Sequence, residues 1–169
     1  LGLIAQILIF TSAIHAMGPL NLPTYFFRIK EDRGKKYIFD EIRRRFVLLT
    51  PEEWVRQHLV NFLVTQKNFP LPLISVEKGF KNNQRKQRYD LLVYDRKGEP
   101  LMMIECKAPG IDINQHVFDQ AGRYNNKYKA AYMLISNGMN HYCCLINKTS
   151  RQYRFLQEIP EYSEMQQGE

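Results

Sequence analysis

The first long pattern of apolar and polar positions runs from residue 50 to residue 66. Thr50 is suited to the N-cap of a helix, Pro51 to its first position, and Glu53 to closing a capping box. The residues that follow repeat at helical spacing, so that one face of the helix packs inward. The inward positions are Trp54, Val55, His58, Leu59, Phe62 and Leu63. The pattern predicts a helix over residues 50–66, and we interpret His58 as a histidine packed in the core.

Shorter apolar runs, separated by turn residues, come next. Leu73–Glu77, Tyr89–Asp95 and Leu101–Lys107 have the composition of strands. The polar residues 82–84 predict a loop between the first two runs, and residues 96–99 link the second run to the third. We therefore expect three strands, of which the last two form a hairpin.

A second helix is predicted from Asp112 or Asn114, either of which can cap it, to about residue 127. Ala130–Ser136 and Tyr142–Ile146 then predict two more strands, and residues 152–155 allow a short additional one. The order helix, three strands, helix, two strands is typical of an α/β sandwich with a central mixed β-sheet.

The two ends of the chain differ from this core and divide the sequence into four segments. We expect an apolar N-terminal segment at 1–16, a basic extension at 17–48, a core at 49–157 and an acidic tail at 158–169. The apolar segment is shorter than the roughly 20 residues of a spanning helix. We interpret it as sequence upstream of a true start at Met17, with a packed apolar arm or a targeting segment as alternatives. The tail has four acids and no Lys or Arg, which predicts a solvated segment.

Composition limits the class of protein. The 169 residues are 44% hydrophobic and 24% charged, which is the balance of one globular domain and not of a disordered, collagenous or polytopic membrane protein. Three cysteines cannot form a closed disulfide framework, because their number is odd. A reduced, cytoplasmic location is the simpler expectation, with no membrane partner.

The net charge of +7 is concentrated in two segments. Residues 28–45 hold eight bases and four acids, a balance of +4, and residues 78–88 hold five bases and no acid. The rest of the chain nets −2, so the excess is local, as a surface that binds a phosphate backbone would require. Solvated loops are the alternative interpretation of such runs. The bases of the second segment, which we expect to contact nucleic acid, are Lys78, Lys81, Arg85, Lys86 and Arg88.

Charged residues also stand inside strands that are otherwise apolar on both faces. Asp90 directly precedes an apolar run, and Glu105 and Lys107 directly follow one. If the hairpin is centred between residues 97 and 98, residues whose numbers sum to 195 are opposite each other. Asp90 then faces Glu105, and Lys107 shares that face. A loop with an odd number of residues, or a bulge near Pro100, would shift this register.

Two carboxylates and an ammonium on one face can hold a hard divalent cation and assist attack on a phosphodiester. A buried ion pair that serves stability is the alternative, because a short D…ExK pattern is common. From the residues alone, the two interpretations have even weight.

The pattern from Asp90 to Glu105-Cys106-Lys107 resembles the D-(x)n-E-x-K signature of the PD-(D/E)XK nuclease superfamily, although Tyr89 stands where that signature has proline. Longer runs within residues 27–155 resemble the N-terminal nuclease domain of type I restriction enzyme R subunits, particularly its small stand-alone forms. These runs are TPEEWVRQHLVNFL, VEKGF, RYDLLVYDRKGEPLMMIECKAP, FDQAGRYN and ISNGMNHYCC. The resemblance implies a restriction-endonuclease-like three-layer sandwich, in which helices flank a central mixed sheet.

The same resemblance implies a Mg²⁺-dependent DNA endonuclease, with Mn²⁺ as a substitute metal. Asp90, Glu105 and the Cys106 carbonyl would bind the metal, and Lys107 would be the catalytic lysine. Methyltransferase, specificity or helicase subunits of a restriction system are the implied partners. No Walker A motif occurs, so the chain lacks the ATPase motor of complete R subunits.

Four further residues are candidates for the site. Gln120 and Tyr124 match the Q-x-x-x-Y motif of the family and share one helical face, where they would support the catalytic lysine or a nucleotide. Glu53 is either an acidic residue of the site or only part of the capping box. Glu77 is a weaker candidate, because a solvent-facing position or a pair with Lys78 or Arg88 explains it better.

Two other functions compete with a DNA nuclease. One is a nucleic-acid-binding or scaffold module that keeps the nuclease fold without turnover, and the other is the same chemistry on RNA or on repair intermediates. A zinc site at His141, Cys143 and Cys144 is disfavoured, because adjacent strand residues point to opposite faces.

Overall fold

The computed structural model describes residues 17–76, 89–147 and 152–166. The apolar segment at 1–16 lies outside these ranges. Glu77 and the second basic segment lie outside them too, so that the predicted nucleic-acid contacts of Lys78, Lys81, Arg85, Lys86 and Arg88 fall on residues that are not described.

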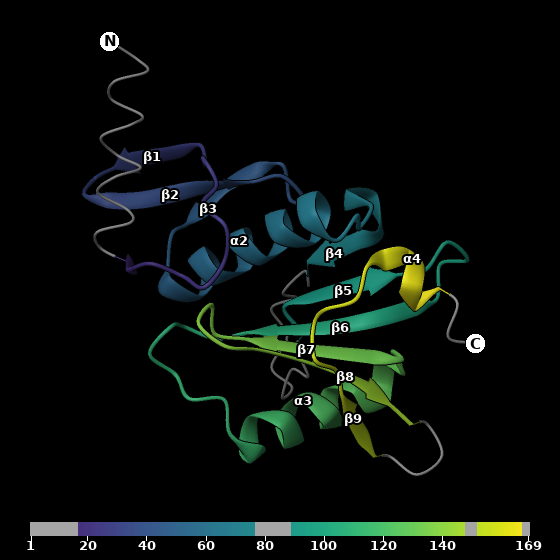
Figure 1. The fold of residues 1–169 in the computed structure, drawn as a ribbon. Helices are drawn as coiled ribbons and strands as arrows, with labels where there is room; N and C mark the ends of the chain where they lie inside the picture. The colour runs from purple at the N-terminus through teal and green to yellow at the C-terminus, as the bar shows by residue number, and fades with distance from the viewer. Residues whose placement is uncertain (1–16, 77–88, 148–151, 167–169) are drawn as a thin grey trace.

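A six-stranded mixed sheet forms the centre of the structure (Figure 1). Its strands, in their order across the sheet, are β4 (Ile74–Val76), β5 (Leu91–Tyr94), β6 (Pro100–Cys106), β7 (Tyr132–Ser136), β8 (His141–Ile146) and β9 (Tyr153–Phe155). Strands β6 and β7 are parallel, and all other neighbours are antiparallel. The parallel pair arises because a helix returns the chain between these two strands.

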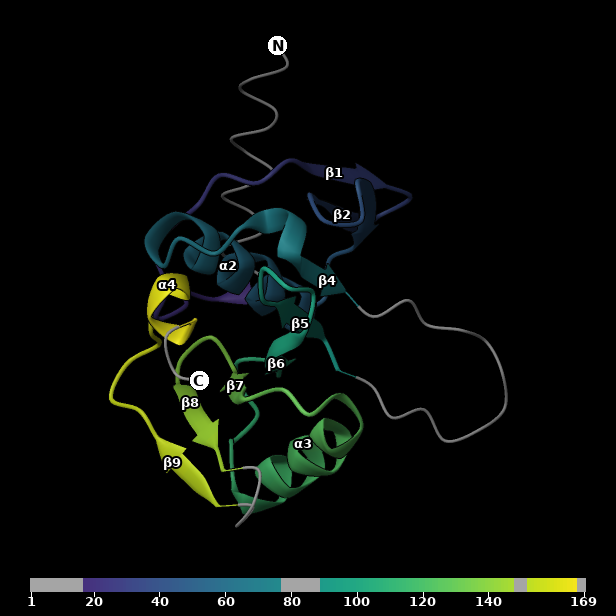
Figure 2. The same ribbon diagram turned by 90° about the vertical axis from the view of Figure 1, so that its right-hand side faces the viewer.

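Helices cover both faces of this sheet, as Figures 1 and 2 show. Helix α2 (Pro51–Gln66) packs on one face, and helix α3 (Gln115–Tyr128) packs on the other. Alternate residues of β6 pack on opposite faces of the sheet. Met102 and Ile104 lie in the hydrophobic cluster with α2, and Met103 lies in the cluster with α3. The expected three-layer sandwich is therefore confirmed. Of the helices in the described ranges, none is long and apolar enough to span a membrane.

The predicted elements of the core are present. Thr50 caps α2 by accepting a hydrogen bond from the Glu53 N–H at 3.1 Å, and Asn114 rather than Asp112 caps α3. His58 is buried against the Trp54 and Phe27 rings, as its interpretation as a core histidine required. A short 3₁₀ turn (Leu71–Leu73) leads into β4.

The basic segment at 28–45 lies in a second sheet, which the sequence pattern did not predict. Strands β1 (Ile29–Asp32), β2 (Lys35–Asp40) and β3 (Arg45–Leu48) form an antiparallel meander. Few positions of each short strand are buried, so most are occupied by charged or exposed residues. The alternation of apolar and polar residues that identifies a strand is therefore hard to see in the sequence. For this segment, the interpretation as a solvated loop was wrong.

The acidic tail is also more ordered than predicted. Helix α4 (Tyr162–Met165) follows a turn in which Ile159 is buried, and both Tyr162 and Met165 are buried against the core. The Tyr162 ring makes an edge contact with Phe69, with centroids 5.4 Å apart. The prediction of a solvated segment was wrong at these positions, because the apolar residues between the acids supply a packing face.

The β5–β6 hairpin has the predicted register, although it reaches that register by another route. The Asp95 N–H donates to the Glu99 carbonyl at 2.8 Å, so the turn has three residues and is not centred between residues 97 and 98. An extra residue, Leu101, is then accommodated between the pairs Tyr94↔Pro100 and Val93↔Met102. The bulge cancels the shift of the odd-numbered turn. From there on, paired residue numbers sum to 195, as the pair Leu91↔Ile104 shows.

Gly98 makes this turn possible, since its φ of 86° lies in the left-handed region. We expect Gly98→Ala to lower the free energy of unfolding by about 1 kcal/mol in urea denaturation, because an L-residue is strained at this φ. Gly110→Ala is the matched control, because an added Cβ meets nothing within 4 Å at either position and Gly110 has no positive φ. Equal destabilisation by the two substitutions would contradict the role of the turn.

Candidate active site

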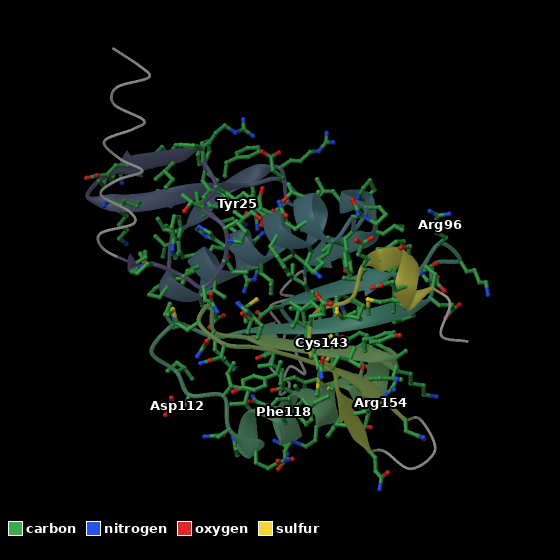
Figure 3. The ribbon with its side chains drawn as sticks, in the orientation of Figure 1. Tyr25, Arg96, Asp112, Phe118, Cys143 and Arg154 are labelled. Atoms are coloured by element: carbon green, nitrogen blue, oxygen red, sulfur yellow. The ribbon has the colours of Figure 1, made fainter. Side chains whose placement is uncertain are left out.

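The predicted catalytic residues meet where β5 begins and β6 ends. The pairing of β5 with β6 ends at Leu91↔Ile104, and the Asp90 N–H donates to the Ile104 carbonyl at 3.2 Å, so the register shifts by one residue at Asp90. The predicted direct pairing of Asp90 with Glu105 is therefore not formed, and Asp90 reaches β6 through its side chain instead. The Asp90 Oδ2 accepts a hydrogen bond from the Cys106 N–H at 2.7 Å, and the Lys107 Nζ lies 2.7 Å from the Glu105 Oε1. The structure therefore brings Asp90, Glu105 and Lys107 together, as their spacing predicted. Arg96 marks the turn at the other end of the hairpin (Figure 3).

Glu105 is the least favourably solvated carboxylate of this group. Burial raises its pKa to about 7, the negative charge of Asp90 adds to the increase, and the hydrogen bond from Lys107 opposes it. A carboxylate in such surroundings gains by binding a positive charge. The two carboxylates thus form a pair that a cation would stabilise.

Lys107 is suited to act as a fixed positive charge. Burial alone would lower its pKa, but the hydrogen bond to Glu105 and the charges of Glu105 and Asp90 raise it above its ordinary value. The ammonium therefore stays protonated at neutral pH. It can orient a phosphate or stabilise developing negative charge, and it is not suited to accept a proton from water.

Arg56 belongs to this site and was missed by the sequence reasoning. Its Nη2 lies 2.8 Å from the Asp90 Oδ1, and its Nη1 lies 2.5 Å from the Glu53 Oε2. Burial would lower the pKa of the guanidinium, but Asp90, Cys106 and Glu53 raise it above its ordinary value. The signal available in the sequence was an arginine three residues after Glu53 on a helix whose neighbouring positions are apolar.

Glu53 connects the site to the meander. Its Oε1 accepts hydrogen bonds from the Arg43 Nη2 at 2.7 Å and the Gln57 Nε2 at 2.8 Å, and Arg43 also forms an ion pair with the buried Asp40. Both oxygens of the Glu53 carboxylate thus bond to side chains, while Thr50 caps the helix with its own hydroxyl. Glu53 thus lies one residue behind Arg56 in this set of ion pairs, and its role as an acidic residue of the site stays a prediction.

Gln120 and Tyr124 contact each other on α3, with the Gln120 Nε2 2.9 Å from the Tyr124 hydroxyl. The expectation that they share one helical face is confirmed. Tyr124 packs at the margin of the cluster between α3 and the sheet, where Figure 3 labels Phe118. Their support of the lysine stays a prediction.

The residues of the site fit a hard divalent cation. Asp90 and Glu105 supply carboxylate oxygens at the same end of the hairpin, and burial and the charge of Asp90 raise the pKa of Glu105, so that a nearby positive charge favours its ionised form. Within the described ranges, no group of three or more His, Cys, Asp or Glu side chains is placed to hold a metal. A cation here would therefore complete its coordination shell with a backbone carbonyl and water molecules. Mg²⁺ usually binds proteins in this way, through one or two carboxylates and several waters. The Cys106 N–H bonds to Asp90, and the predicted role of the Cys106 carbonyl as a ligand stays a prediction.

Cysteine side chains take no part in such a site. Cys106 is fully buried in the cluster with α2, and burial raises the pKa of its thiol. Cys143 and Cys144 lie in the clusters on opposite faces of the sheet, as their adjacent positions on β8 predicted.

Comparisons with known proteins agree with this architecture. A family model described as the N terminus of the type I restriction enzyme R protein matches residues 51–160. A solved fragment assigned to the HsdR subunit of a type I restriction enzyme from Vibrio vulnificus YJ016 is similar over 69% of this chain, with a TM-score of 0.50 and 18% identity. The likeness to that fragment concerns the fold, and this chain covers 24% of its length. The comparison with curated proteins finds no match.

The burial of Arg56 between two carboxylates gives a test of its role. We expect Arg56→Met to lower the free energy of unfolding by about 3–5 kcal/mol, because the partly buried Asp90 would lose its ion pair and the buried Glu53 would keep only the one with Arg43. Arg28→Gln is the control. It breaks an ion pair with Glu41 in which both side chains are 58% exposed, and should cost no more than about 1 kcal/mol. Urea denaturation measures the free energy of unfolding of both variants. Similar losses of stability in the two would contradict the role of Arg56 as a buried counter-charge.

Proposed function

Because the chain belongs to the family of type I restriction enzyme R protein N-terminal domains, we propose that it is a metal-dependent DNA endonuclease. The observation that carries the proposal is the meeting of Asp90, Glu105 and Lys107 at one end of the β5–β6 hairpin. Two carboxylates beside a lysine form the donor set and fixed charge that phosphodiester hydrolysis requires. The raised pKa of Glu105, which burial and the charge of Asp90 bring to about 7, supports the proposal, because such shifts are concentrated at functional sites.

In this proposal, Asp90, Glu105 and the Cys106 carbonyl hold Mg²⁺, and Mn²⁺ can take its place. When bound, the metal supplies an activated water and neutralises charge on the scissile phosphate. Asp90 is already oriented for this task, because the Cys106 N–H and Arg56 each bond to one of its oxygens. Both oxygens retain lone pairs for a metal.

The remaining groups bind and orient the substrate. Lys107 stays protonated and places its positive charge beside Glu105, where it would contact a non-bridging phosphate oxygen. Arg56 acts as a positioning residue, since it holds Asp90 and Glu53 in place from helix α2. Gln120 and Tyr124 would brace Lys107 or a nucleotide from α3.

The basic segment at 78–88 would bind the phosphate backbone. It carries five bases and no acid, and it joins β4 to β5 immediately before Asp90. Contacts of this kind position the duplex without reading its sequence. Sequence choice would then come from partner subunits of a restriction system, of which methyltransferase, specificity and helicase subunits are the candidates.

Cleavage of supercoiled plasmid DNA in the presence of Mg²⁺ tests the mechanism. We expect Lys107→Ala to slow nicking by at least about 100-fold, because one fixed charge beside the reacting phosphate is lost. Lys97→Ala is the matched control, since Lys97 lies in the turn at the opposite end of the hairpin, and it should cleave like the wild type. Equal rates for wild type and Lys107→Ala would refute the assigned role. Cleavage of RNA but not of plasmid would favour the RNA nuclease.

Isothermal titration calorimetry with Mg²⁺ and Mn²⁺ separates a nuclease from a module that only kept the fold. We expect a binding heat with the wild type and its loss in Asp90→Asn, which removes one of the two carboxylate charges. Asp119→Asn, at an exposed position of α3, controls for nonspecific effects of the lost charge and should keep the heat. If the wild-type heat is absent, or persists unchanged in Asp90→Asn, the metal site is not where we place it.

A further inference from the structure

The meander β1–β3 has two faces of different character. Ile29, Ile38 and Val47 are direct register partners, and they pack with the buried Trp54 of helix α2. Because side chains alternate along a strand, the neighbouring positions point away from this core. The side chains that point away, which we call the outer face, are Arg28, Lys30, Tyr37, Phe39, Phe46 and Leu48.

The outer face carries an aromatic cluster on a solvated sheet. Phe39 and Phe46 are direct register partners, and their ring centroids lie 5.2 Å apart in an edge contact. Phe46 is 37% exposed and the neighbouring Leu48 is 47% exposed. Isolated exposed apolar residues need no explanation, but three aromatic rings and a leucine on one small sheet form a surface that a ligand can cover.

Two cations stand directly over these rings. The Arg28 guanidinium carbon lies 3.5 Å from the Phe39 ring centroid, and the Lys30 Nζ lies 4.7 Å from the Phe46 centroid and 5.7 Å from the Tyr37 centroid. The segment that builds the meander has a net charge of +4. One of its four acids, Asp40, is buried in the ion pair with Arg43 and does not face a ligand. Another of the acids, Glu41, forms an ion pair with Arg28 at 2.9 Å, in which both side chains are 58% exposed. The outer face therefore combines aromatic rings with the cations Arg28 and Lys30, and a phosphate that binds Arg28 would displace the Glu41 carboxylate.

We propose that the outer face of the meander binds a single-stranded nucleic acid, whose bases stack on Phe46 and its neighbouring rings while the phosphates contact Arg28 and Lys30. Aromatic rings and guanidinium planes are the surfaces on which unpaired bases stack. These cations complement a polyanion and disfavour a protein partner that is itself positively charged. A duplex fits less well, because its bases are already stacked inside the helix and cannot reach the rings.

This binding surface does not depend on the nuclease chemistry. The ion pair of Arg43 with Glu53, and of Glu53 with Arg56, connects the meander to the candidate active site. The outer face and the active site nevertheless share no residue. A single strand held here would lie on the same protein as the site that we propose cuts DNA. Its binding can be measured without metal, so failure of one proposal leaves the other intact.

Fluorescence anisotropy with a labelled twenty-nucleotide thymidine strand, full-length protein and EDTA tests the proposal. We expect Phe46→Ala to raise the Kd at least about fivefold, because one lost base–aromatic stack weakens binding by roughly five- to more than a hundredfold. Phe46→Trp, which keeps a stacking ring, should bind at least as tightly as the wild type. Phe155→Ala removes an exposed phenylalanine from β9, at the far edge of the central sheet, and should leave the Kd unchanged.

An abasic strand of the same length separates stacking from phosphate binding. It should bind the wild type more weakly than the thymidine strand does, and Phe46→Ala should not weaken it further. Fluorescence of Trp54, the single tryptophan of the chain, reports whether the meander stays docked in each variant. Wild-type affinity in a folded Phe46→Ala, or an equal loss of affinity for the abasic strand, would overturn the proposal.

Discussion

The Arg56 guanidinium, buried between Glu53 and Asp90, is the interaction on which the geometry of the site depends. A charge taken out of water is tolerated only when it is paired, so each of these groups requires the others. Through Glu53 the same set of ion pairs reaches Arg43 and the meander. Helix α2, strand β5 and the meander are thereby held in one relative position at the point where the proposed chemistry occurs.

The sheet contributes the second constraint, which is register. A one-residue slip between β5 and β6 would turn Glu105 away from Asp90, because successive side chains of a strand point to opposite faces. The three-residue turn at Gly98 by itself introduces such a slip, and the bulge at Leu101 removes it. The irregularity of the hairpin therefore keeps β5 and β6 in the register that brings Asp90 and Glu105 to the same end of the hairpin.

Electrostatics within the site follow from these two constraints. Glu105 is forced near Asp90 in a buried place, and Lys107 offsets only part of the resulting repulsion. The same proximity keeps Lys107 protonated. Asp90 and Glu105 are each paired with one cation, Arg56 and Lys107, and the pKa of Glu105 is nevertheless raised. This is the local physics on which the proposed metal-dependent chemistry is based.

Much of this protein was determined by local sequence. Capping residues and helical spacing located α2 and α3, apolar runs located β5 to β8, and the spacing of Asp90 from Glu105 and Lys107 predicted their meeting, because these signals act over a few residues or across one hairpin. Tertiary structure decided the rest. Arg56 enters the site only because α2 packs against the sheet, and the strands of the meander gain their stability from docking on Trp54. Burial of the residues around α4 likewise depends on a core that lies about ninety positions away in the chain. Contacts between distant segments leave no periodic trace in the sequence, because either partner alone resembles an ordinary surface residue.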